Sequence, residues 1–406
     1  QPSSRPAHHP YSPLGDHAHP PRIRTNFASA MPLRTVDLGG SGLKVPIVCM
    51  GTMTMGEQTN EQESFELLDY CMERGVNFID TAELYPVPPC LKNNNATEIM
   101  LGNWFESRKN REKVILATKV SGPSDLKRSY IKARRSDPRM TVGEVPPNDG
   151  SEPHLTRDQI LEACAASLVR MKTDYIDLYQ IHWPERYAPL WGSRQYIAGK
   201  EKPGLDVVAN IEETVGAIGE LLRSGKIRHW GLSNETTYGV CLYAQACAKL
   251  GVVGPITIQN DFSLVSRQFD TELAEACAPA AYNIHLLAYG PLAGGTLTGK
   301  YHDKHMAVDK ARHTLFKDFQ SRYHCPRTME ATSKYMELAK SKNLTVTQLA
   351  LAWCANRWYM GSVIIGATTM EQLKENIDAC EVELDEETCK AVDAIHLEIR
   401  NPNSTD

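Results

Sequence analysis

The regular recurrence of short apolar runs, with helical periodicity between them, restricts this chain to few folds. Eight such runs begin near Ile47, Asn77, Val114, Tyr175, His229, Ile256, Ile284 and Ser362. Runs such as Val363–Ile365 are continuously apolar, which is typical of strands that are buried on both faces of a sheet. Eight buried strands that alternate with helices favour a closed (β/α)8 TIM barrel over an open sheet. We therefore predict a single α/β barrel.

Three of the intervening helices have clear sequence boundaries. They run from Asn60 to Gly75, from Ile211 to Gly225 and from Thr369 to Cys380, with apolar residues spaced by three and four. Glu63 and Gln372 stand three residues after Asn60 and Thr369. This spacing is typical of a capping box, in which each side chain bonds the backbone N–H of the other residue. Glycine after the last turn predicts the end of the first two helices.

The distances between strand starts locate three insertions. The intervals are 30, 37, 61, 54, 27, 28 and 78 residues, whereas a strand–helix–strand unit needs about 30. The chain therefore has long loops after strands three, four and seven, which we expect on the carboxyl-terminal rim where barrel active sites lie. The first insertion carries the basic run Lys127–Arg139, which we interpret as a solvated loop because the whole chain gives no support for a phosphate-rich partner.

A glycine-rich turn precedes the first barrel strand. Gly39-Gly40-Ser41-Gly42 lies between two strand-like runs and is not followed by a helix. A dinucleotide-binding fingerprint requires a strand before the glycines and a helix after them. We therefore predict an N-terminal β-hairpin that closes the floor of the barrel.

Residues 1–30 differ from the rest of the chain. They are rich in Pro, His, Ser and Ala and contain one acidic residue, Asp16, so they cannot bury a core. We expect a disordered leader, or an extension upstream of Met31, followed by a barrel domain over residues 31–406. The eleven cysteines form no CxxC pair, which favours reduced thiols in a cytoplasmic protein. Targeting to an organelle by residues 1–30 is the alternative.

Charge and hydropathy exclude two classes of partner. The formal net charge is −5, which lacks the basic footprint of a nucleic-acid binder. No apolar stretch approaches the ~20 residues that span a bilayer. We therefore expect neither nucleic acid nor membrane as a partner, and the sequence leaves the oligomeric state open.

Four titratable residues follow successive strands. Asp80 ends the second, Tyr85 follows five residues later, Lys119 ends the third and His182 ends the fourth. Because parallel strands end at one rim, these side chains should converge. Carbonyl reduction needs a proton donor, and a tyrosine with a pKa near ~10 donates poorly unless its phenolate is stabilised. A lysine beside it, held in the charged form by an aspartate, supplies that stabilisation.

Six phrases make the sequence resemble the aldo-keto reductases, in particular their Tas-like branch, which is related to potassium-channel β subunits. They are GTMTMGEQ (51–58), AELYPVPP (82–89), KVSGPS (119–124), QIHWPER (180–186), GLSNET (231–236) and GATTMEQLKENI (366–377). The resemblance covers residues 33–395. It implies that Asp80, Tyr85, Lys119 and His182 are a catalytic tetrad, with Tyr85 as general acid. Met53, Tyr85, His182 and Trp183 would contact the substrate, an aldehyde or ketone.

The same resemblance implies an NADP(H) site. Its residues would be Gly51, Thr52, Met53, Asp80, Ser233, Asn234, Gln259, Tyr289, Gly290, Leu292, Gly294, Lys300, Arg312, Gly366, Thr368, Gln372, Glu375 and Asn376. Many relatives carry Lys and Arg where this chain has Gly366 and Gln372. The preference for NADP(H) over NAD(H) therefore depends on Lys300 and on Arg312, whose guanidinium suits the adenosine 2′-phosphate.

Other motifs and the shared fold raise three alternatives. Residues 294–300 match a phosphate-binding P-loop up to Lys300, but Tyr301 replaces its Ser or Thr, which argues against an NTPase. The pair His302 and His305 lacks further ligands at a structural spacing, so we predict no metal site. A cofactor-binding, redox-sensing or regulatory subunit with slow or secondary catalysis is the remaining alternative, because the channel β subunits share this fold.

Overall fold

Eight parallel strands close into a barrel in the computed structural model, which describes residues 32–124, 130–137, 152–302 and 308–405. Hydrogen bonds between β10 and β3 complete the ring. Each strand begins within two residues of its expected start, so the (β/α)8 prediction is confirmed. The barrel strands are β3 (Val48–Gly51), β4 (Phe78–Asp80), β5 (Ile115–Val120), β6 (Ile176–Ile181), β7 (Ile227–Ser233), β8 (Thr257–Asp261), β9 (His285–Tyr289) and β10 (Met360–Ile365).

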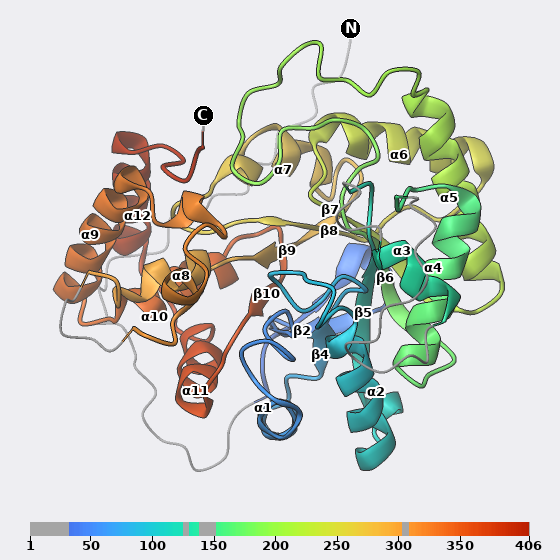
Figure 1. Cartoon of the computed structure of the whole chain (residues 1–406). Helices are drawn as coiled ribbons and strands as arrows, with labels where there is room; N and C mark the ends of the chain where they lie inside the picture. Colours follow the sequence, from blue (N-terminus) through green and yellow to red (C-terminus); the bar gives the residue numbers. More distant parts are fainter. Residues whose placement is uncertain (1–31, 125–129, 138–151, 303–307, 406) are drawn as a thin grey trace, which may run out of the picture.

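Helices surround this barrel (Figure 1). They are α1 (Glu61–Glu73), α2 (Ala96–Arg108), α3 (Tyr130–Ser136), α4 (Arg157–Arg170), α5 (Val207–Arg223), α6 (Thr237–Leu250), α7 (Glu272–Cys277), α8 (Arg312–Leu315), α9 (Pro326–Ser341), α10 (Val346–Ala355), α11 (Met370–Ala379) and α12 (Glu386–Glu398). Helix α1 has the predicted capping box between Asn60 and Glu63. In α11 only one of the two hydrogen bonds of the predicted capping box is present. Thr369 caps the helix, but Gln372 accepts hydrogen bonds from Thr368, one residue earlier.

The N-terminal hairpin closes the barrel floor as predicted. Its strands β1 (Thr35–Asp37) and β2 (Lys44–Pro46) pair antiparallel. At the turn, Gly39 has a φ of 59°, and its N–H donates to His285 Nδ1 over 2.9 Å. A Cβ at Gly39 would lie 3.0 Å from the Cβ of Ile256, so glycine permits this close approach.

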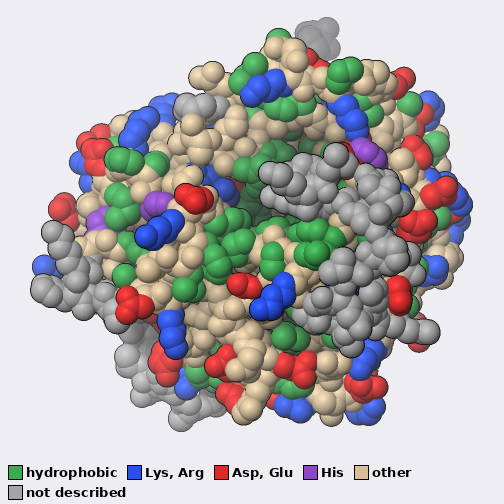
Figure 2. Space-filling view, in the orientation of Figure 1, with side chains coloured by type: hydrophobic (Ala, Val, Ile, Leu, Met, Phe, Trp, Pro, Cys, Tyr) green, Lys and Arg blue, Asp and Glu red, His purple; other side chains and the backbone are tan. Residues whose placement is uncertain are grey.

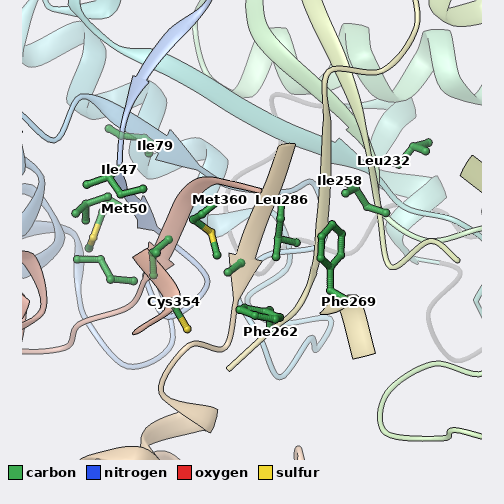
Figure 3. Packing of buried hydrophobic residues seen from close by; sticks show 14 of the residues in the cluster. Ile47, Met50, Ile79, Leu232, Ile258, Phe262, Phe269, Leu286, Cys354 and Met360 are labelled. Carbon is green, nitrogen blue, oxygen red and sulfur yellow. The ribbon is translucent and has the colours of Figure 1, made fainter. Parts of the chain in front are cut away.

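Alternation along the strands divides the core into two compartments. Inward-facing residues pack with hairpin residues in the lumen: Leu38, Val45, Cys49, Phe78, Ala117, Leu178, Ile256, Leu287 and Ile364. Their neighbours in sequence face the helices, and Figure 3 shows part of that larger cluster, including Met50, Ile79 and Leu286. The lumen is therefore filled from the floor, and the opposite mouth of the barrel is left for polar side chains.

The three predicted insertions are present, and one was misinterpreted. They contain α3 after β5, residues 182–206 after β6, and the segment with α8 and α9 after β9. The basic run Lys127–Arg139 is not simply a solvated loop, because part of it forms α3 and buries Arg134 and Arg135. Residues 127–129 and 138–139 lie outside the described residues. Burial of Arg135 is possible because Glu83 pairs with it.

Two further observations concern the whole described chain. All eleven cysteines lie in it as free thiols, and most are buried. Across residues 32–405, apart from the gaps given above, no helix has the length and apolar character needed to cross a membrane. Residues 1–30 lie outside the described residues, so the division into leader and barrel domain remains a prediction.

Candidate active site

A buried ion pair lies at the carboxyl-terminal mouth of the barrel. Lys119 Nζ lies 2.6 Å from Asp80 Oδ2 and donates to Thr81 O over 2.7 Å. The Lys119 side chain is completely buried and that of Asp80 is 2% exposed. A charge removed from water in this way requires a partner and further hydrogen bonds. The adjacent strands β4 and β5 supply both because each ends at this rim.

Tyr85 and His182 meet at this ion pair. The Tyr85 hydroxyl lies 3.5 Å from Lys119 Nζ, and the Tyr85 and His182 rings are 5.9 Å apart in an edge-on arrangement. The structure therefore brings all four residues of the predicted tetrad together. Their roles in catalysis remain predictions.

The charge environment differs from the simple expectation for the tyrosine. Burial raises the pKa of Tyr85 and outweighs the nearby Lys119 ammonium, which lowers it. Burial lowers the pKa of Lys119, but Asp80 and Tyr85 together hold it above its ordinary value. The ammonium is therefore retained, and the tyrosine is protonated at neutral pH. The site therefore holds a protonated phenol, that of Tyr85, beside the charged ammonium of Lys119.

His182 is held as a neutral imidazole. Burial, and then the charge of Lys119, bring its pKa well below the ordinary value. Its carbonyl oxygen accepts from Asn234 Nδ2 over 2.8 Å, which fixes the backbone at the end of β6. Its Nδ1 is buried and has no hydrogen-bond partner among the described residues. A neutral ring at the barrel mouth can orient a polar ligand atom without adding charge.

Two glutamines donate hydrogen bonds to the other carboxylate oxygen of Asp80. Gln180 and Gln259 donate to Asp80 Oδ1 over 3.1 and 2.8 Å. Gln259 was predicted as a cofactor residue, whereas Gln180 was missed. The signal for Gln180 was available, because it precedes His182 by two residues and therefore faces the same side of its strand.

The predicted nicotinamide residues form one hydrogen-bonded group at the ends of β7 and β9 and in the middle of β8. Ser233 Oγ donates to the Gln259 carbonyl over 2.8 Å, and Asn234 Nδ2 donates to Ser233 Oγ over 3.1 Å. The Tyr289 hydroxyl donates to Asn234 Oδ1 over 2.7 Å. These bonds hold the four side chains next to the tetrad, because Gln259 also contacts Asp80.

The residues expected near both cofactor and substrate also lie at this rim. Thr52, directly after Gly51 of β3, donates from Oγ1 to the Asp80 carbonyl over 2.9 Å. Met53 packs against an apolar cluster that contains Tyr85 and Trp183. The rings of Trp183 and His182 are 4.7 Å apart.

The loop after β9 brings two cations together. Gly290 and Gly294 have φ values of 66° and 65°, and Leu292 precedes a short 3-10 segment that leads to Lys300. Burial and the charge of Arg312 lower the pKa of Lys300, and burial lowers the pKa of Arg312. Within the described residues neither cation forms an ion pair with a carboxylate. Two half-buried cations without a counterion suit a phosphate.

The remaining predicted residues lie at the start of α11. Thr368 N–H and its hydroxyl donate to Gln372, and Asn376 Nδ2 donates to the Gly366 carbonyl over 3.2 Å. Glu375 does not join this group. It is exposed and accepts from the Thr345 hydroxyl, at the start of α10, over 3.3 Å.

A second buried ion pair at the rim was missed. Arg135 from α3 donates to both carboxylate oxygens of Glu83, over 2.6 and 3.1 Å. Glu83 Oε1 also accepts from Ser121 N–H over 2.7 Å. Glu83 lies two residues before Tyr85, and Ser121 lies two residues after Lys119. This pair therefore connects the loop of the tyrosine to the strand of the lysine.

A metal site finds no support in the residues that the structure describes. No group of three or more His, Cys, Asp or Glu side chains is placed there to hold an ion. His302 Nε2 lies 2.9 Å from the Met329 carbonyl oxygen, whereas His305 lies outside the described residues.

A barrel of this topology with Asp, Tyr, Lys and His at its mouth is the arrangement of an oxidoreductase family. The family model for the "Aldo/keto reductase family" matches residues 47–397, and the chain belongs to that family. It is similar to the "Protein tas" of Escherichia coli (strain K12), with 39% identity over 88% of this chain and 95% of that protein. The "Uncharacterized oxidoreductase YrpG" of Bacillus subtilis is 31% identical over 88% of this chain and 94% of its own length. The "Probable voltage-gated potassium channel subunit beta" of Arabidopsis thaliana is 30% identical over 85% of this chain and 90% of its own length.

Proposed function

We propose that this protein is an NADPH-dependent oxidoreductase that reduces a small aldehyde or ketone to an alcohol, reversibly. The observation that carries the proposal is the buried line of polar groups from Asp80 through Lys119 to the Tyr85 hydroxyl. A fixed ammonium beside a protonated phenol is suited to deliver a proton to an oxygen that gains negative charge.

Each side chain of the tetrad has a separate role in carbonyl reduction. NADPH supplies the hydride that reaches the carbonyl carbon. The Tyr85 hydroxyl donates a proton to the carbonyl oxygen, and Lys119 stabilises the resulting phenolate. Asp80 keeps Lys119 charged and fixed in position, because its carboxylate contacts the ammonium at 2.6 Å. The neutral His182 ring orients the carbonyl oxygen for this transfer.

The residues around the tetrad fit the cofactor that this chemistry needs. Ser233, Asn234, Gln259 and Tyr289 offer amide, hydroxyl and aromatic groups within one connected group beside Asp80. They would hold the nicotinamide. Lys300 and Arg312 would hold the phosphates, and a contact between Arg312 and the 2′-phosphate would give the preference for NADP(H) over NAD(H).

Replacement of the general acid tests the proposal. Tyr85→Phe removes the hydroxyl but keeps the ring, so turnover of aldehydes should fall by about 10²–10⁴-fold. Binding of NADPH, followed by fluorescence, should remain close to that of the wild type. Tyr238→Phe is the matched control, because Tyr238 is 58% exposed on α6. Near-normal turnover by Tyr85→Phe would remove this tyrosine from the role.

The similarity to a probable potassium channel subunit supports a second candidate, a regulatory protein that binds the cofactor and reduces substrates slowly. A stopped-flow measurement separates the two. Rapid oxidation of bound NADPH by aldehydes is the result expected of the enzyme. A bound cofactor that is inert towards aliphatic, aromatic and dicarbonyl compounds would favour the regulatory protein.

A further inference from the structure

Trp191 has an unusual combination of conformation and exposure. It lies in the insertion after β6 with a φ of 60°, and its side chain is 51% exposed. A bulky residue in the left-handed region is a strained exception, because its Cβ crowds the backbone. Such strain points to a function when the surrounding structure holds the residue in place.

The C-terminal segment holds this turn. The Thr405 N–H donates to the Gly192 carbonyl over 2.9 Å. Arg194 donates to Asn403 Oδ1 over 2.6 Å. Gly192 and Arg194, one and three residues after Trp191, are thus tied to a segment more than two hundred residues away in the sequence. The exposed position of the indole is therefore fixed by tertiary contacts.

The Trp191 indole continues a row of aromatic rings that begins at the tetrad. Its ring centre lies 6.1 Å from that of Trp183, and Trp183 lies 4.7 Å from His182. Partly buried apolar side chains packed on the Tyr85 cluster are Met53, Leu91, Leu190 and Phe319. Figure 2 shows a hollow near the middle of the molecule with hydrophobic side chains gathered around it. An apolar surface thus leads outward from the proposed reaction centre.

We propose that Trp191, together with Trp183, binds a planar aromatic group of the substrate, so that aryl aldehydes and ketones are the preferred class. This inference rests on the proposed function. Aromatic rings favour edge-on or offset contacts with one another, and the half-exposed Trp191 keeps accessible surface for such a contact. The substrate carbonyl lies at Tyr85 and His182, while its aromatic part extends towards Trp191.

Paired substrates test the preference. NADPH consumption is measured with naphthaldehyde and with hexanal. The wild type should prefer naphthaldehyde, and Trp191→Ala should reduce kcat/KM for naphthaldehyde by about tenfold, mainly through KM. Hexanal should change by less than about twofold, and Trp191→Phe should retain most of the preference because a ring is kept. Equal losses for both aldehydes, or no loss for either, would overturn the inference.

A matched variant and a binding measurement complete the test. Trp358 is 58% exposed in the turn before β10, at the opposite end of the barrel, so Trp358→Ala should leave both kcat/KM values unchanged. Equilibrium dialysis of naphthalenemethanol with the NADPH-bound protein needs no turnover. Weaker binding in Trp191→Ala than in the wild type supports the aromatic site even when neither aldehyde is reduced. Absent or unchanged binding refutes it, whatever the activity.

Discussion

Removal of one partner from the buried pair of Glu83 and Arg135 should destabilise the protein far more than the same change in an exposed pair with the same geometry. Both side chains are 1% exposed. Of the Glu83 contacts described above, Arg135→Met leaves only the hydrogen bond from the Ser121 N–H. A buried charge that loses its ion-pair partner in this way costs about 3–5 kcal/mol. The matched control is Arg157, which contacts Glu220 over the same 2.6 Å with exposures of 48% and 36%. Arg157→Met should cost much less, because solvent screens an exposed ion pair.

Urea unfolding followed by tryptophan fluorescence measures both costs. The double variant Glu83→Gln/Arg135→Met removes both charges, so it should be less destabilised than the sum of its single variants, by about 0.5–3 kcal/mol. Activity provides a second measurement, because Glu83 lies two residues before Tyr85. Arg135→Met should lower kcat while the dissociation constant of NADPH changes little, since Lys300 and Arg312 lie on other segments.

The pH dependence of the stability loss in Arg135→Met tests whether the isolated Glu83 carboxylate causes it. Burial raises the pKa of Glu83, but Arg135 outweighs burial and keeps it below the ordinary value. Without Arg135 the carboxyl should accept a proton more readily, and the stability deficit of Arg135→Met should shrink as the pH falls towards 5. Three results would refute the reasoning: a cost no larger than that of Arg157→Met, full additivity in the double variant, or a deficit independent of pH.

Two other outcomes follow from the charged groups. Arg312→Ala should weaken binding of NADPH by about tenfold or more while binding of NADH changes little, since a charge-assisted contact to phosphate is worth about 1.5–3 kcal/mol. Dissociation constants for both cofactors decide this, and an unchanged preference would contradict it. Burial lowers the pKa of His396 to about 4, so the unfolded chain binds its proton first as the pH falls below about 6.5. The free energy of unfolding should therefore decrease from pH 7 to pH 5, and His396→Gln should reduce that slope; equal slopes would show that His396 does not contribute.

The barrel and the convergence of the four tetrad residues were predictable because their signals are local. Asp80, Lys119 and His182 end apolar runs of the right length, and parallel strands bring their ends to one rim. The partner of Gln372 was not predictable, since Thr368 and Thr369 are adjacent and chemically identical. Only the backbone conformation decides which of them it contacts.

Arg135 and Trp191 were unpredictable for a different reason. Arg135 belongs to a run of basic residues that reads as solvated, and its partner Glu83 lies 52 residues earlier in another loop. The sequence around Trp191 does not indicate a left-handed conformation. The contacts that hold its turn come from Asn403 and Thr405, which are far away in the sequence. Both features depend on contacts between insertions, where sequence patterns carry least information.

The position of Lys119 shows why buried charges gather at this rim. Glu83 accepts from the backbone of Ser121, and Glu98 accepts from the Thr118 hydroxyl over 2.6 Å while it pairs with Arg170. Two buried carboxylates thus hold β5 on both sides of Lys119, and Asp80 binds the ammonium itself. Buried ion pairs are often no more stabilising than apolar residues of similar size, so stability alone does not account for three of them around one strand. We infer that they fix the lysine, because a displaced ammonium would lose the contact with Tyr85 on which the proposed proton transfer depends.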